Sequence, residues 1–118
     1  MQVEPHITFR NMHPSEAVEA AVRDRVARLD RLFPNLTSCR VMIEEHHRHH
    51  QQGNLFHVRV DVTAPGHELV SGRESDANHA HEDIYVAVRD AFDAMDRQVE
   101  NLAQVMRGDV KTHQPRNA

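Results

Sequence analysis

The sequence predicts an α+β fold with the element order β-α-β-β-β-α, in which both helices pack on one face of a single four-stranded sheet. Two kinds of hydrophobic pattern predict this fold. Two long stretches repeat apolar residues every three or four positions, as amphipathic helices do, and four shorter stretches alternate apolar with polar residues, as half-buried strands do. Such elements bury their apolar sides together when the helices cover one face of the sheet and water meets the other.

The predicted strands differ in how clearly they alternate. The third, residues 56–63, is the clearest, because all its even-numbered residues are apolar and all its odd-numbered ones are polar. The first contains Pro5, which suits an edge strand or the start of a strand better than a central position. The fourth follows the turn residues 64–67, and its register is the least well defined. The predicted ranges are 3–9, 38–45, 56–63 and 68–74.

The first predicted helix begins at residues 13–16, with Pro14 in its first turn, and ends near Phe33 because Pro34 and Asn35 follow. Its apolar residues form one stripe on a helical wheel. They are Val18, Val22, Val26, Leu29 and Phe33.

The second predicted helix begins near Ala80, after a cap at Asp76 or Asn78, and ends at Gly108. Asp83, near its start, suits the positive end of the helix dipole, and we expect Tyr85 to pack against the sheet. Its stripe has a near-heptad spacing. The stripe consists of Ile84, Val88, Phe92, Met95, Val99, Leu102 and Met106.

Length and composition indicate a single domain. The chain has 118 residues, of which 39% are hydrophobic and 27% charged, enough to bury a modest core. We expect the domain to span residues 1–108 and a flexible tail to follow at 109–118. The single cysteine excludes an intramolecular disulfide, and no membrane span or signal sequence is apparent. These observations predict a soluble, cytoplasmic protein without a membrane partner.

The charge is unevenly distributed. The formal net charge is −4, whereas simple nucleic-acid binders are usually basic. Residues 10–59 nevertheless hold eight Arg against six acids, while residues 61–118 hold six basic residues against eleven acids. Thirteen of the 14 basic residues are Arg, which suits bidentate contacts with phosphates, although a GC-rich coding sequence would give the same bias.

A histidine-rich run separates the second and third predicted strands. Neutral imidazoles bind Zn²⁺ or Ni²⁺, so the candidate ligands of a metal site are His46, His47, His49 and His50. A polar turn between strands explains the run more simply, because a metal site needs fixed geometry. We therefore predict no metal site and no cofactor.

Catalytic signatures are missing from the sequence. It contains no nucleophile elbow, no glycine-rich phosphate loop and no zinc-peptidase helix. We therefore predict that the protein is not an enzyme and has no small-molecule substrate.

Several segments together resemble a known family. They are Val26-Ala27-Arg28-Leu29-Asp30-Arg31-Leu32, Gly53-Asn54-Leu55-Phe56-His57-Val58, Pro65-Gly66-His67-Glu68-Leu69-Val70, Glu82-Asp83-Ile84-Tyr85-Val86-Ala87-Val88, Asp90-Ala91-Phe92-Asp93-Ala94 and Arg97-Gln98-Val99-Glu100. In this order and spacing they resemble the short form of the ribosome hibernation promoting factor and ribosome-associated inhibitor A family, also called the sigma modulation protein family.

The resemblance implies both a fold and a function. The fold would have two roughly parallel helices on a four-stranded sheet, similar to a double-stranded RNA-binding domain. The protein would bind RNA of the small ribosomal subunit near the decoding centre and block tRNA and mRNA binding, without chemistry. Basic side chains of the helices and neighbouring loops would contact phosphates, with Arg25, Arg28 and Arg31 as the first candidates. The full candidate set is Arg23, Arg25, Arg28, Arg31, Arg89, Arg97, Arg107 and Lys111.

The acidic second helix leaves an alternative open. Asp93 can pair with Arg89 and Arg97, which are its i,i+4 neighbours, and such pairing would compete with phosphate contact. The alternative is a protein-interaction module of the same fold with weak or no RNA binding, for example a homodimer formed through a strand edge or the open sheet face. An electronegative helix surface in the folded domain would favour it.

Overall fold

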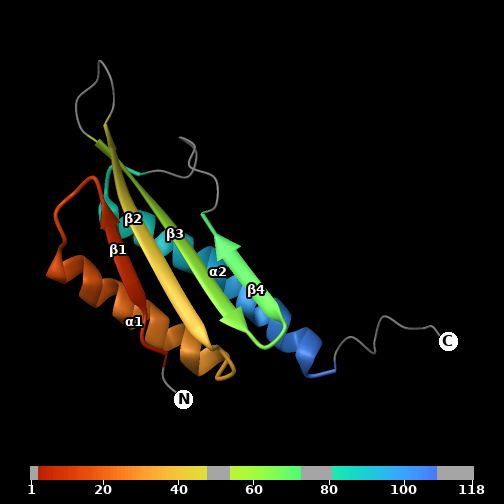
Figure 1. The fold of residues 1–118 in the computed structure, drawn as a ribbon. Coiled ribbons are helices and arrows are strands. Elements are labelled where there is room, and N and C mark those ends of the chain that lie inside the picture. The colour runs from red at the N-terminus through yellow and green to blue at the C-terminus, as the bar shows by residue number, and fades with distance from the viewer. Residues whose placement is uncertain (1–2, 48–53, 73–80, 109–118) are drawn as a thin grey trace.

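The computed structural model describes residues 3–47, 54–72 and 81–108. The described chain forms four strands and two helices in the predicted order (Figure 1). Their bounds are β1 (His6–Arg10), α1 (Glu16–Leu32), β2 (Ser38–His47), β3 (Asn54–Ala64), β4 (His67–Ser71) and α2 (Ile84–Met106). Neither helix of the described chain is long and apolar enough to span a membrane.

The strands form one sheet in the order β1-β2-β3-β4. β1 runs parallel to β2, with Ile7 beside Val41, whereas β2-β3 and β3-β4 are antiparallel pairs. The long β2-β3 pair extends from Ser38 opposite Thr63 to His47 opposite Asn54. β1 is an edge strand, as expected from Pro5, but it begins at His6, directly after Pro5, rather than at Val3.

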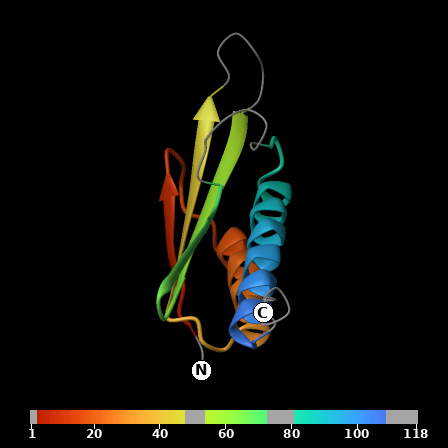
Figure 2. The ribbon, with the colours of Figure 1, turned by 90° about the vertical axis from the view of Figure 1, so that its right-hand side faces the viewer.

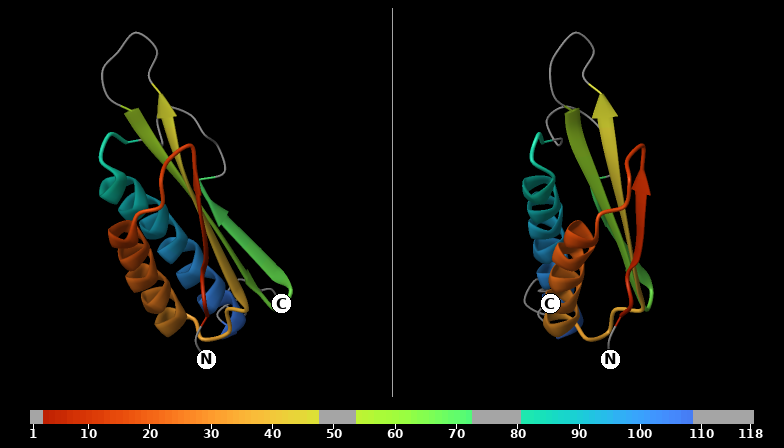
Figure 3. Two further views of the ribbon diagram at one scale, coloured as in Figure 1. Left: turned by 60° about the vertical axis from the view of Figure 1, so that its left-hand side comes forward. Right: turned by 90° about the vertical axis from the view of Figure 1, so that its left-hand side faces the viewer.

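Both helices lie side by side on one face of the sheet, and no helix of the described chain lies on the other face (Figures 2 and 3). They run in roughly the same direction, and α2 begins beyond the first turn of α1. The core fills the space between the helix layer and the sheet. It contains the predicted stripe of α1, the inward residues Cys39, Val41 and Ile43 of β2, and the stripe residues Val88, Phe92, Met95 and Val99 of α2. The predicted α+β fold is therefore confirmed.

The helix starts differ from their predicted positions. α1 is capped by Ser15, whose Oγ accepts a hydrogen bond from the Val18 amide at 3.2 Å, so Pro14 precedes the helix instead of lying in its first turn. α2 is capped by Asp83, whose Oδ1 accepts a hydrogen bond from the Tyr85 amide at 2.8 Å. The predicted start near Ala80 is wrong. α2 begins after Asp83 because this aspartate accepts hydrogen bonds from backbone amides of the first turn, which would otherwise lack a partner. Asp76 and Asn78 lie outside the described residues, as do residues 109–118.

Gly72 follows β4 at a point where the chain passes very close to β3. Its φ is +74°, and a Cβ atom at this position would lie 2.1 Å from the carbonyl oxygen of Val58. We expect Gly72→Ala to lower the free energy of unfolding by about 2–4 kcal/mol, because the clash adds to the strain of a positive φ.

Gly66 provides a matched control for this prediction. Its φ is +77°, but a Cβ there would meet nothing within 4 Å. Gly66→Ala should therefore cost only the backbone strain, about 1 kcal/mol. Urea unfolding of the two variants measures the difference, and equal losses would contradict the importance of the close approach to Val58.

Candidate nucleic-acid interface

The side of the two helices that faces away from the sheet, called here the helix face, carries most of the candidate arginines. Arg28 and Arg31 lie on α1, and Arg89 and Arg97 lie on α2, all of them exposed. Arg31 and Arg97 form no ion pair within the described chain, so their guanidinium groups are available to an anionic partner. Arg107 is exposed at the C-terminal end of α2, and Lys111 lies outside the described residues.

Arg25 lies between the helices instead of on their outer side. Its Nη2 contacts Asp93 Oδ1 at 2.8 Å and Asp96 Oδ2 at 2.9 Å, and its side chain is only 15% exposed. Its guanidinium carbon is also 5.7 Å from the centre of the Phe92 ring, which adds a cation–π contact. Arg25 therefore joins α1 to α2, and any contact with a phosphate would compete with these bonds.

The acidic residues of α2 pair differently from the expectation. Asp93 pairs with Arg25 across the helix boundary, not with Arg89 or Arg97 along its own helix. Arg89 pairs with its sequence neighbour Asp90, with 3.2 Å between Nη2 and Oδ1. The expected i,i+4 pairs are therefore wrong, because a partly buried guanidinium offers Asp93 a better-desolvated partner than an exposed neighbour does.

The Arg25 contacts neutralise two carboxylates of α2. Asp96 is 8% exposed, and Arg28 Nη2 approaches its Oδ2 at 3.6 Å as a second cation. Arginines of α1 thus neutralise Asp93 and Asp96, whereas Arg31 and Arg97 have no carboxylate partner among the described residues. The helix face is therefore less negative than the sequence of α2 implies.

Arg23 extends to the other side of α1, towards the entry to β1. Its Nη1 lies 2.6 Å from Glu4 Oε2, and both side chains are well exposed. Exposed pairs of this kind contribute little to stability, about 0–1 kcal/mol.

Tyr85 is a surface residue that the sequence reasoning missed. The expectation that it packs against the sheet is wrong, because the residue is 49% exposed. Tyr85 belongs to the first turn of α2. This turn lies beyond the N-terminal end of α1, so α1 does not cover it (Figure 2). A helical wheel places Tyr85 in line with buried Phe92, so the sequence of α2 alone predicts burial. The exposure of Tyr85 follows only from where the two helices begin relative to each other.

The histidine run lies only partly within the described chain. His46 ends the outward side of β2, with its Nε2 3.3 Å from Glu44 Oε1. The side chain of His47, and all of His49 and His50, lie outside the described part. Among the residues that the structure describes, no three potential ligands are grouped as a metal ion would require.

Cys39 is a buried thiol of the core. Burial raises its pKa from 9.0 to about 12, and nearby Asp61 adds to the rise. The folded protein holds this proton more tightly than the unfolded chain does. The neutral thiol therefore makes its full contribution to the free energy of unfolding below pH 9. This contribution is lost as the pH rises towards 12, by on the order of 1 kcal/mol per pH unit.

This predicts a pH dependence that a substitution removes. The free energy of urea unfolding should fall more steeply between pH 8.5 and 10.5 for the wild type than for Cys39→Val. Identical pH profiles for the two proteins would contradict a buried neutral thiol at this position.

Comparison with known proteins identifies relatives for nearly the whole chain. Residues 6–107 match the family model described as Sigma 54 modulation protein / S30EA ribosomal protein. The ribosome hibernation promoting factor of Azotobacter vinelandii is 30% identical over 99 residues, which cover 84% of this chain and 79% of that protein.

Two solved structures share the fold. The N-terminal domain of Thermus thermophilus Protein Y aligns with a TM-score of 0.63 and 24% identity, covering 86% of this chain and 99% of that one. A ribosomal subunit interface protein from Coxiella burnetii aligns with a TM-score of 0.67 and 13% identity, covering 87% and 98%. The resemblance drawn from the sequence is confirmed, and the chain belongs to the Sigma 54 modulation protein / S30EA ribosomal protein family.

Proposed function

We propose that this protein is a cytoplasmic ribosome hibernation factor, which binds RNA of the small ribosomal subunit near the decoding centre and blocks tRNA and mRNA binding. Membership of the family and the similarity to a ribosome hibernation promoting factor support the ribosome as its partner. The proposal goes beyond this partnership in its binding site, near the decoding centre, and in its competition with tRNA and mRNA.

One observation carries the proposal of RNA contact. Within the described residues, Arg31 of α1 and Arg97 of α2 present guanidinium groups without an ion pair, while Arg25 and Arg28 contact the acids Asp93 and Asp96 between the helices. A guanidinium group donates paired hydrogen bonds to a phosphate, and its fixed charge persists at any physiological pH. An array of such groups on a rigid pair of helices can follow the phosphates of a folded RNA.

The candidate arginines take different parts in this proposal. Arg28, Arg31 and Arg97 are the proposed phosphate contacts, because all three are exposed. Arg31 and Arg97 form no ion pair with the described residues, and Arg28 approaches Asp96 only to 3.6 Å. Arg89, Arg107 and Lys111 remain predicted contacts. Arg25 is assigned to holding the helices together, and Arg23, bonded to Glu4, is left out of the contact surface.

The proposed mechanism is occupancy. A folded domain that fills the space of tRNA and mRNA prevents initiation without forming or breaking a covalent bond. Inhibition then depends only on the fraction of subunits occupied, and it reverses when the protein dissociates.

Co-sedimentation with purified small ribosomal subunits across a salt series tests this function. Binding at low salt should weaken steeply as salt rises, with a slope of log K against log salt that counts the phosphate contacts. Binding that does not depend on salt would overturn the phosphate mechanism. Absence of binding at low salt would overturn the proposed function and favour a protein-interaction module.

A further inference from the structure

The side of the sheet that faces away from the helices, called here the sheet face, carries a second group of arginines. Arg10 ends β1, Arg40 lies on the outward side of β2, and Arg59 lies on β3 opposite Met42. They line one groove of about 460 Å³. Its other lining residues are His6, Thr8, Val41, Met42 and Asp61.

The carboxylates of this face lie beneath the guanidinium groups. Asp61 accepts a hydrogen bond from Arg59 Nε at 2.9 Å and is only 14% exposed, whereas Arg40, 3.9 Å from it, is 67% exposed. Glu44 is likewise largely buried, and its Oε2 accepts a hydrogen bond from the side-chain amide of Asn11 at 3.3 Å. The guanidinium groups are therefore more exposed than Asp61 and Glu44, although Glu68 of β4 is exposed at the far edge and Glu4, 82% exposed, lines the neighbouring groove.

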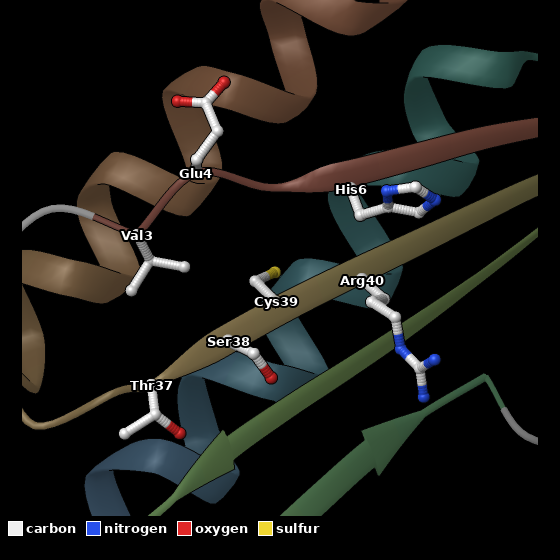
Figure 4. A pocket seen from close by; sticks show the side chains of 7 residues that line it. All are labelled: Val3, Glu4, His6, Thr37, Ser38, Cys39 and Arg40. Atoms are coloured by element: carbon white, nitrogen blue, oxygen red, sulfur yellow. The ribbon is translucent and has the colours of Figure 1, made fainter.

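Hydroxyl groups extend this surface towards the start of β2. Thr37 and Ser38 line a neighbouring groove of about 550 Å³, which shares His6 and Arg40 with the first (Figure 4). The Thr63 hydroxyl lies 2.7 Å from that of Thr37 and 2.6 Å from that of Ser38. Hydroxyl groups beside guanidinium groups are a typical donor set for phosphate oxygens.

The chemistry of the sheet face favours RNA over a second protein chain. The centre of a stable protein interface is apolar and poor in charge. Here the outward side chains at the centre of the sheet are Arg40, Met42, Arg59 and Asp61, of which only Met42 is apolar. A charged, hydroxyl-rich surface of this kind matches the phosphate backbone of a nucleic acid.

We propose that the sheet face is a second RNA-phosphate surface, centred on Arg40, so that the bound protein lies between two RNA segments, one on each face. The proposal rests on the proposed function, since it takes its RNA from the same small subunit. It differs in location, because its arginines belong to β1, β2 and β3, whereas those of the helix face belong to the helices in the other layer (Figure 3).

Neutralising substitutions test the sheet face without placing like charges together. Arg10→Gln and Arg40→Gln avoid a new carboxylate beside Glu44 or Asp61, which are their neighbours across the strand pairs. In co-sedimentation with small subunits, Arg40→Gln should reduce the salt slope by about 1 and the double variant by about 2. Affinity at moderate salt should fall by about tenfold or more for the double variant.

Arg23→Gln is the matched control, because it removes the same charge from an exposed side chain of α1 that is remote from the sheet face and bonded to Glu4. It should leave the slope and affinity unchanged, and urea unfolding should show that all variants remain folded. If the sheet-face variants bind like the wild type while substitutions on the helix face weaken binding, the second surface is refuted and the proposed function stands. If the wild type does not bind small subunits, both proposals fail.

Discussion

Changing Arg31 and Arg97 together to Glu is expected to reduce small-subunit binding by about a hundredfold or more. Each arginine is exposed and free of ion pairs among the described residues, so the change breaks no internal contact. Each charge-assisted hydrogen bond is worth about 1.5–3 kcal/mol, and the introduced carboxylates repel phosphates. Co-sedimentation at fixed moderate salt measures the loss.

The control for this prediction is Arg23→Glu, which makes the same charge reversal at a neighbouring arginine of α1 that is already bonded to Glu4. Its new carboxylate meets Glu4, but both side chains are exposed and the repulsion costs little. If Arg23→Glu weakens binding as much per residue as the paired substitution does, the effect reflects net charge and the helix face is not the contact. Wild-type affinity of the Arg31/Arg97 variant would contradict the proposed interface directly.

Replacing Arg25 by Leu is expected to lower the free energy of unfolding by about 3 kcal/mol. The substitution leaves Asp96, which is 8% exposed, with only Arg28 at 3.6 Å as a cation. Removing one partner of a buried ion pair costs more than the pair itself contributes, because the remaining charge stays desolvated. Urea unfolding measures the loss, and Arg25→Leu combined with Asp96→Leu should recover most of it.

The same variant separates two roles for Arg25. If Arg25 only joins the helices, the salt slope of subunit binding should be unchanged in Arg25→Leu once binding is referred to the folded fraction. If Arg25 itself contacts a phosphate, the slope should fall by about 1. A stability close to that of the wild type would contradict the structural role.

The order and faces of the elements could be predicted because apolar periodicity is a local property of the chain. In β3, for example, alternation alone identified Val58, Val60 and Val62 as core residues, and all three are buried. The parallel pairing of β1 with β2 follows from contacts between distant segments, so no local pattern specified it.

The candidate site was less predictable, because ion pairing depends on tertiary neighbours. Asp93 has two arginines at i,i+4 positions on its own helix, but its partner is Arg25, which is 68 positions away in the sequence. Tyr85 is exposed because α2 begins beyond α1, a fact that neither helix contains by itself. The outward arginines of the sheet face are similarly visible as a group only once β1, β2 and β3 are paired.

Competition with tRNA tests the central claim most directly. Small ribosomal subunits carrying mRNA and labelled tRNA would be titrated with the protein, and the bound tRNA would be measured by filter binding. The proposed function predicts that tRNA is released in proportion to the protein bound, and that excess tRNA and mRNA displace the protein in the reverse titration. Stable subunits that carry both the protein and tRNA would contradict a factor that acts by occupying the tRNA and mRNA sites.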